Sequence, residues 1–341
     1  MRLEYLGPSP EPIGFLLLPR FSMMAFFSAV EPLRIANRIA GRPLFDWILI
    51  SEDGAPVTAS SGMTLVVDQS IAEVRHLPSL AVCSGFHPEA AISRELLAWL
   101  HRLDQSGCAL GGMDTGCFLL AAAGLLEGER VTLHWESLPT FRERFPGIST
   151  SDELYELGHR RFSCAGGAAA MDMTLEIIAR RHGSRLAVDV SEQLVHERIR
   201  TRSDQQRRSL AQRLGTHKRP LVEAVALMER HLETPLSLTE IARRVHVSPR
   251  QLQRLFEQEL QDRPRDYYLK LRLKRARQLL EETDLDVLSI ALACGFSSSS
   301  GLSRAFRGHY AMSPRQVRNT TFDSTTFDDA TKPDAASRQG S

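Results

Sequence analysis

The sequence predicts an α/β domain with a largely parallel sheet, followed by an all-α domain made of two similar helical units. Three observations lead to this prediction. The chain has 341 residues, which is long for a single ordinary core. Short β-type runs alternate with helix-type runs over roughly the first 200 residues. One helical pattern then occurs twice in the last third of the chain.

Charge is distributed unevenly along the chain. The net charge is only +1, but residues 217–318 carry 18 Lys and Arg against 12 Asp and Glu, so the remainder is acidic. A basic module beside an acidic one is typical of a polyanion-binding domain joined to a domain for a different ligand. A charged surface that is merely solvated is the alternative.

The cysteines indicate neither a disulfide framework nor a metal site. There are five of them, an odd number, and none forms a C-x-x-C pair. We therefore expect reduced thiols, no metal and no cofactor. We find no signal-peptide pattern and no apolar run near the roughly 20 residues that span a bilayer, so we expect a cytoplasmic chain without a membrane partner.

The first domain is expected over residues 10–202. Its strands are predicted from apolar runs at 13–18, 47–51, 80–83, 108–113, 131–134 and 162–165. Its helices are predicted from periodic runs at 23–40, 88–106, 116–125, 138–145, 171–182 and 186–202. Residues 203–219 hold few large apolar side chains after Leu214 and are predicted to be a linker. Residues 319–341 lose apolar periodicity and are predicted to be a disordered tail.

The second domain is expected over residues 220–318, and residues 236–256 predict a helix-turn-helix. Ser237 to Glu240 form a capping-box pattern at the start of one helix. His246-Val247 makes the turn, and Ser248 and Pro249 are typical of the start of the next helix. Apolar spacing buries Leu252, Leu255 and Phe256. The same spacing makes four side chains face outward, and these can hydrogen-bond to base edges: Arg250, Gln251, Gln253 and Arg254.

The same pattern returns in residues 286–306, which is far more specific than a lone motif. Ile241-Ala242 corresponds to Ile290-Ala291, and Val245 to Cys294. Between the units, residues 265–283 predict a helix of about 28 Å at 1.5 Å per residue. Such a helix would hold two recognition helices near the roughly 34 Å between successive major grooves.

This tandem arrangement resembles the AraC/XylS family of bacterial transcription regulators over residues 221–318. The resemblance implies that the second helix of each unit enters the major groove of double-stranded DNA. In the second unit it implies base or phosphate contacts by short side chains and one arginine, namely Ser299, Ser300, Ser303 and Arg304. Gly301 and the serine run depart from common family versions. We therefore expect the first unit to discriminate sequence more and the second to position the backbone more. The alternative is that these arginines are solvated helix faces.

Residues 111–128 predict a strand, a tight glycine-containing turn and a helix. They are similar to the nucleophile elbow of the class I glutamine-amidotransferase-like superfamily, in its PfpI branch, which implies a flavodoxin-like fold. Catalytic members carry a cysteine at the elbow, whereas alignment through residues 123–126 puts Asp114 there. The aspartate is a weak nucleophile, so a non-catalytic binding domain is expected. Together the two halves resemble AraC-type regulators with a PfpI-like sensor, in the subgroup governing carnitine, glycine betaine and arginine catabolism.

We expect an effector pocket around this elbow. Two carboxylates and an indole suit a cationic ligand, so a small amine or quaternary ammonium metabolite is the expected effector. The expected pocket residues are Glu31, Asp114, Thr115, His134, Trp135, Cys164 and Gly166. Each has a structural alternative: Asp114 as a helix cap, Trp135 as core, Glu31 as a partner of Arg34, and His134 as a structural histidine.

The resemblances imply an activator of a catabolic operon that binds operator DNA and RNA polymerase. A homodimer is expected, through the first domain or residues 186–202. Two alternatives remain open. One is a bifunctional protein whose first domain hydrolyses an amide or deglycates through Cys117, Cys164 or Asp114. The other is a constitutive architectural DNA binder with an inert dimerisation domain.

Overall fold

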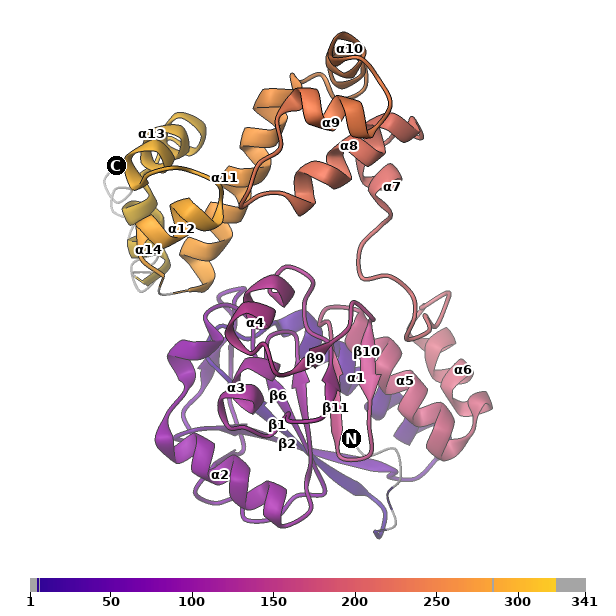
Figure 1. Ribbon diagram of the computed structural model, residues 1–341. Coiled ribbons are helices and arrows are strands. Elements are labelled where there is room, and N and C mark those ends of the chain that lie inside the picture. The colour runs from indigo at the N-terminus through magenta and orange to yellow at the C-terminus, as the bar shows by residue number, and fades with distance from the viewer. Residues whose placement is uncertain (1–4, 6, 284, 323–341) are drawn as a thin grey trace, which may run out of the picture. The chain divides into compact units, whose positions relative to one another are not determined.

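A computed structural model describes residues 5, 7–283 and 285–322 of the chain (Figure 1). It divides into two compact units, with the boundary between Arg208 and Ser209. The first unit is built on a central sheet and the second consists of helices, as the sequence predicts. Among the described helices none is both long and apolar enough to cross a bilayer.

The central sheet of the first unit has seven strands in the order β10-β11-β7-β6-β1-β2-β5. All neighbouring strands are parallel except β10, an antiparallel edge strand. Their bounds are β1 Glu11–Leu17, β2 Phe45–Ser51, β5 Gln69–Ser70, β6 Ser79–Cys83, β7 Ala109–Met113, β10 Tyr155–Leu157 and β11 Arg161–Cys164. Because β6, β7 and β11 are parallel, the loops that follow them meet at one edge of the sheet.

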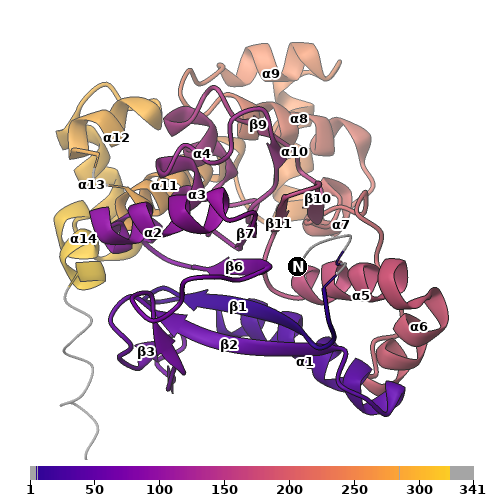
Figure 2. The same ribbon diagram turned by 90° about the horizontal axis from the view of Figure 1, so that it is seen from below.

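Helices cover both faces of this sheet, which gives the flavodoxin-like three-layer arrangement (Figure 2). Side chains alternate along β1 and into the residue after it, so Phe15 and Leu17 enter one core while Leu16 and Leu18 enter the other. The first core is closed by α1 (Met23–Ala40), α5 (Ala169–His182) and α6 (Ser184–Gln193). The second is closed by α2 (Arg94–Gln105), α3 (Cys117–Ala122) and α4 (Leu138–Arg144).

Several elements differ from the sequence prediction. The helix expected over 186–202 ends at Gln193, and Val195 then has φ 54°, which a helix does not accommodate. The strand expected over 131–134 shrinks to β8 (Arg130–Val131), which pairs with β9 (Ser149–Thr150) outside the central sheet. The helix expected over 88–106 splits into a 3-10 turn (Pro88–Ala91) and α2. The small sheet of β3 (Val57–Thr58) and β4 (Thr64–Leu65) was not predicted.

The second unit has two cores that share one helix. Tyr268 of α11 (Pro264–Glu282) belongs to the first core, whereas Leu273, Ala276 and Leu279 of the same helix belong to the second. The first core also uses α8 (Arg219–Arg230), α9 (Leu238–Arg244) and α10 (Pro249–Leu260). The second uses α12 (Val287–Ala293), α13 (Ser299–Tyr310) and α14 (Pro314–Phe322). The predicted connecting helix is therefore confirmed as a common strut.

The expected linker over residues 203–219 is divided between the two units. Gln206 donates hydrogen bonds to Thr132 and Glu153 of the first unit. Residues from Ser209 onward belong to the second unit, where α7 (Leu210–Leu214) is fixed by an ion pair between Arg213 and Glu229 at 3.1 Å. At the other end, α14 extends to Phe322 into the predicted tail. Residues 323–341 lie outside the described residues.

Candidate functional site

The turn after β7 places Asp114 at the carboxyl edge of the sheet. Asp114 has φ 60°, a left-handed conformation that is uncommon for a residue with a side chain. Its backbone N–H donates to the Cys164 carbonyl at 3.1 Å, and its own carbonyl accepts from the His134 N–H at 3.3 Å. These two hydrogen bonds attach the elbow to the end of β11 and to the segment around His134. They hold Asp114 in a backbone conformation that is unfavourable by itself.

Two glycines make this tight turn possible. A Cβ added at Gly116 would lie 2.1 Å from the Val82 carbonyl oxygen of the neighbouring strand. A Cβ added at Gly166 would lie 2.6 Å from Oδ2 of Asp114, and Gly166 has φ +81°. Glycine is needed at both positions because the backbone of one segment approaches another more closely than a side chain allows.

A cavity of about 280 Å³ lies beside Asp114. Four of the residues expected from the sequence line it: Asp114, His134, Trp135 and Gly166. The remaining lining residues come from the start of α1, from the strand ends, from the start of α5 and from the end of the first unit, namely Ser22, Leu154, Ala165, Gly167, Ala168, Ala169, Arg200 and Gln206. The structure thus brings part of the predicted site together and adds residues to it.

Three expected pocket residues are not among those that line the cavity. The Thr115 hydroxyl donates to the Gly85 carbonyl at 2.6 Å, so this side chain fixes the elbow to the loop after β6. Cys164 is fully buried in the core under the sheet edge. Glu31 forms an ion pair with Arg34 at 2.6 Å, which was the alternative considered for it. Glu31 thus lies outside the lining of this cavity, and a neighbour one helical turn away satisfies its charge.

The segment before Ser209 contributes residues that the sequence did not indicate. Arg200 lines the cavity while its guanidinium donates two hydrogen bonds to Asp172, at 2.6 and 2.9 Å. The guanidinium of Arg207 lies 3.9 Å from the centre of the Trp135 ring. A position on the indole that a cationic ligand would use is thus taken by an arginine of the chain itself. No local pattern reveals this contact, because the residues are about 70 positions apart.

Burial controls the ionisation of the groups near the cavity. Burial lowers the pKa of His134, Glu136 opposes this change and the positive charge of Arg207 adds to it. Burial also raises the pKa of the Cys164 thiol to about 12, and raises that of Cys117 further. A thiol that is not deprotonated near neutral pH is a poor nucleophile. Among the described residues, no group of His, Cys, Asp and Glu could hold a metal ion.

The first candidate DNA-binding helix is α10, whose amino end is fixed by a reciprocal capping box. Ser248 Oγ accepts from the Gln251 backbone N–H at 3.2 Å, and Gln251 Oε1 accepts from the Ser248 N–H at 2.8 Å. The Gln251 side-chain oxygen is therefore used in the cap rather than presented outward. Gln253 donates to Glu257 at 2.9 Å. Arg250 and Arg254 are exposed on the same helix.

In α9 the predicted capping box is only half formed. Ser237 Oγ accepts from the Glu240 N–H at 3.1 Å, but the Glu240 carboxylate pairs with Arg243 and Arg244 at 2.8 and 2.6 Å. These hydrogen bonds lower the pKa of Glu240 to about 2. The Glu240 carboxylate, which the capping-box motif would place on the Ser237 backbone N–H, is therefore bound by two arginines of the same helix.

The second candidate DNA-binding helix is α13, which Ser298 caps by accepting from the Gly301 N–H at 3.1 Å. Ser300 lies 3.1 Å from the Ser298 hydroxyl oxygen and is exposed, as is Arg304. Ser299 and Ser303 are half-buried. The turn before this helix has Gly295 at φ +72°, where the first unit has His246 at φ +57°. The two turns therefore share a backbone conformation, which confirms the repeat.

Comparison with known proteins agrees with this geometry. A helix-turn-helix domain model matches residues 241–320, and the DJ-1/PfpI family model matches residues 15–180. The chain is 50% identical to the HTH-type transcriptional regulator CdhR of Pseudomonas aeruginosa, over 89% of this chain and 90% of that one. It is 42% identical to the HTH-type transcriptional regulator GbdR of the same species, over 91% and 84%. A crystal structure of an AraC family transcriptional regulator from Pseudomonas putida has a TM-score of 0.50 and 32% identity, covering 54% of this chain and 100% of that one.

A flavodoxin-like domain joined to two helix-turn-helix units defines a DNA-binding transcription regulator. The chain belongs to the AraC-type regulators that carry an amino-terminal DJ-1/PfpI domain, in the subgroup with CdhR and GbdR.

Proposed function

We propose that this regulator activates a catabolic operon in the cytoplasm when its DJ-1/PfpI domain binds a small amine, quaternary ammonium or amino-acid metabolite, without catalysing a reaction on it. The observation that carries the proposal is the half-buried carboxylate of Asp114 at the elbow, on a cavity that Trp135 and His134 also line. A carboxylate at this position attracts a cation, and the indole face provides a second favourable contact.

Arg207 at the Trp135 ring is the charge that a cationic ligand would have to displace. Arg200 is the arginine that lines the cavity, and the fully buried Asp172 neutralises it through two hydrogen bonds. A volume of about 280 Å³ suits a metabolite of a few heavy atoms rather than a peptide. The absence of catalysis is supported by the buried thiols, whose raised pKa values oppose thiolate formation.

Thermal denaturation of the full chain against amino acids, betaines, carnitine and simple amines tests the effector. A ligand that binds the native state raises the apparent stability in proportion to the logarithm of its concentration above Kd. Asp114→Asn should keep the left-handed backbone, which asparagine tolerates, and should weaken binding of the active cation by about tenfold or more. Glu31→Gln removes an equal charge outside the cavity and should leave binding unchanged.

Two results would support the competing functions. Stability that no compound in the panel changes would favour a constitutive DNA binder. Turnover of an amide or ester substrate that Asp114→Asn abolishes would favour a bifunctional enzyme. Equal loss of binding in Asp114→Asn and Glu31→Gln would place the ligand elsewhere.

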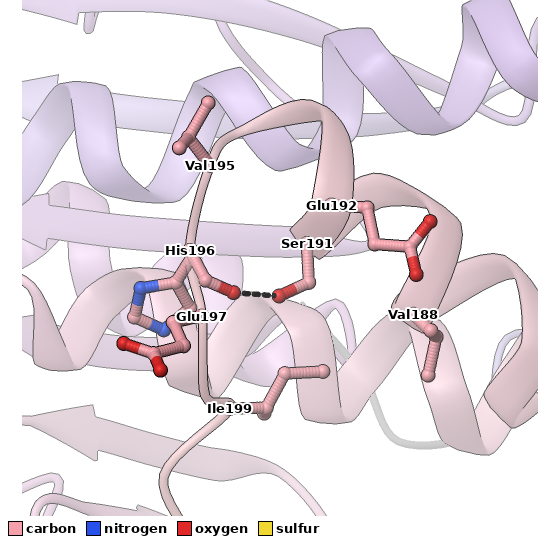
Figure 3. A pocket seen from close by; sticks show the side chains of 7 residues that line it. All are labelled: Val188, Ser191, Glu192, Val195, His196, Glu197 and Ile199. Atoms are coloured by element: carbon pink, nitrogen blue, oxygen red, sulfur yellow. Dashed lines mark hydrogen bonds between the residues drawn. The ribbon is translucent and has the colours of Figure 1, made fainter.

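We further propose that the protein acts on operator DNA as a homodimer and contacts RNA polymerase there. A second cavity, of about 540 Å³, supports an interface at the end of α6 (Figure 3). Val188 and Val195 line it with 43% and 92% of their surfaces exposed, so an interface here would remove exposed apolar surface from water. Sedimentation velocity should show a dimer that Val195→Asp weakens, and a monomeric wild-type protein would contradict the proposal.

A further inference from the structure

Residues 198–208, which we call the exit segment, lead from α6 to the second unit and are bound along the first unit. Their upstream part is strongly fixed. Asp172, which is fully buried, accepts from the backbone and the guanidinium of Arg200 at 2.6 to 2.9 Å. Arg202 pairs with Glu153 and Glu156 at 3.1 and 3.2 Å. Removing one partner of a buried charge pair is costly, so this part stays in place.

The downstream part is held by two side chains at the cavity. Gln206 lines the cavity, and its Nε2 donates to Thr132 Oγ1, Leu133 O and Glu153 O at 2.9 to 3.1 Å. Its Oε1 is buried and accepts no hydrogen bond from the residues that the structure describes. A buried polar atom without a partner costs free energy. The hydrogen bonds of Nε2 therefore offset only part of the cost of burying the Gln206 amide.

Arg207 makes the second contact, and it is one that a cation would disturb. Its guanidinium lies 3.9 Å from the centre of the Trp135 ring, and Trp135 lines the cavity. Two positive charges beside one indole repel each other. The same charge also disfavours protonation of His134. Arg207 is two residues before Ser209, the first residue of the second unit.

We propose that Gln206 and Arg207 form a releasable latch, which a cationic ligand in the cavity opens by replacing Arg207 at Trp135. Opening frees residues 205–208 while Arg200 and Arg202 stay bound and Asp204 keeps its ion pair with Arg198 and its hydrogen bonds with Thr201. Occupation of the cavity is thereby converted into a change in the chain that immediately precedes the DNA-binding unit. The ligand needs a different affinity for the closed and open states, and competition with Arg207 provides that difference. This inference rests on the proposed function for the identity of the ligand.

Variants of the full chain test the latch without any ligand. Gln206→Ala and Arg207→Gln each remove one contact, whereas Arg207→Lys keeps the positive charge at Trp135. Arg208→Gln is the matched control, because Arg208 is an exposed arginine of the same segment. Hydrogen exchange should be about tenfold faster over residues 205–208 in Gln206→Ala and Arg207→Gln, and near the wild-type rate in the other two variants.

DNA binding is the second measurement. A site selected from random oligonucleotides by the wild-type protein should be bound with an affinity changed by about threefold or more in Gln206→Ala and Arg207→Gln, and unchanged in Arg208→Gln. Unchanged exchange in both variants would overturn the latch. Faster exchange with unchanged DNA affinity would also overturn it, since release would then not reach the second unit.

Tetramethylammonium chloride serves as a minimal cationic probe and separates the two proposals. It should accelerate exchange over residues 205–208 in the wild type and have little further effect in Arg207→Gln. If neither this probe nor any metabolite cation binds, the proposed effector class is wrong, and the ligand-free variants alone then decide whether a latch exists. Binding of the probe without faster exchange in the wild type would overturn opening by a cation.

Discussion

Gly166 and Asp114 approach so closely that a Cβ on the glycine would lie 2.6 Å from the aspartate carboxylate. Gly166 also has φ +81°, which L side chains rarely adopt. We expect Gly166→Ala to destabilise the protein by about 1 to 3 kcal/mol and to displace the carboxylate. Urea denaturation gives the stability and calorimetry gives the binding of the effector.

Gly167→Ala is the control for this variant. Gly167 also has a positive φ, +52°, but a Cβ there meets nothing within 4 Å. Because Gly167 also lines the cavity, it serves as a control for folding stability and not for ligand binding. An equal loss of stability in both variants would mean that the contact between Gly166 and Asp114 carries no steric cost.

The turn of the second helix-turn-helix unit should be intolerant of any side chain. A Cβ at Gly295 would lie 2.5 Å from Pro235 and 2.6 Å from the Leu232 carbonyl oxygen, and φ is +72°. Gly295→Ala should cost about 2 to 4 kcal/mol of folding free energy. Gly215 has a similar φ, +65°, but a Cβ there meets nothing within 4 Å. Gly215→Ala should therefore cost only about 1 kcal/mol of folding free energy. Equal losses of thermal stability would disprove the steric argument.

Stability should fall on mild acidification partly through His134. Burial lowers its pKa, so the unfolded chain binds a proton on this histidine at a higher pH than the folded protein. This contribution is complete above the ordinary pKa of about 6.5 and is lost as the pH falls toward the lower folded pKa. His134→Gln should reduce the loss of unfolding free energy between about pH 7.5 and pH 5.5. A loss over this pH range that is the same in His134→Gln as in the wild type would contradict the contribution of His134.

The exposed arginines of α10 are expected to contact DNA. Arg254→Ala should weaken binding to a selected operator by about 1 to 3 kcal/mol if the side chain reads a base edge. Arg219→Ala on α8 removes an equal charge, already paired with Glu223 at 2.7 Å, and should have a smaller effect. Fluorescence anisotropy at fixed salt measures both. An equal loss for Arg254→Ala on random DNA would make it a phosphate contact.

The native thiols should be unreactive. All five cysteines are buried, and burial raises the pKa of Cys164 to about 12 and that of Cys294 to about 11. A disulfide reagent near pH 8 should react slowly with the native protein and with all five thiols after denaturation. One thiol that reacts rapidly in the native state would reopen the enzymatic alternative.

Sequence patterns predicted the parts of this protein that depend on local spacing. The alternating elements predicted a parallel sheet with helices on both faces, and the doubled motif predicted two helix-turn-helix units on a shared helix. The elbow motif predicted a tight turn at Asp114, which has φ 60°. The sequence predicts these features because side-chain periodicity and glycine positions determine the local backbone structure over a few residues.

Tertiary packing decided which side chains share the cavity. It placed Arg200 and Gln206 beside Asp114 and put Arg207 on Trp135. The expected linker became in part a bound segment, because Gln206 finds three acceptors more than 50 residues away in the sequence. Such contacts depend on the path that the segment after α6 takes along the first unit. That path is determined by burial of the whole core and not by a local sequence pattern.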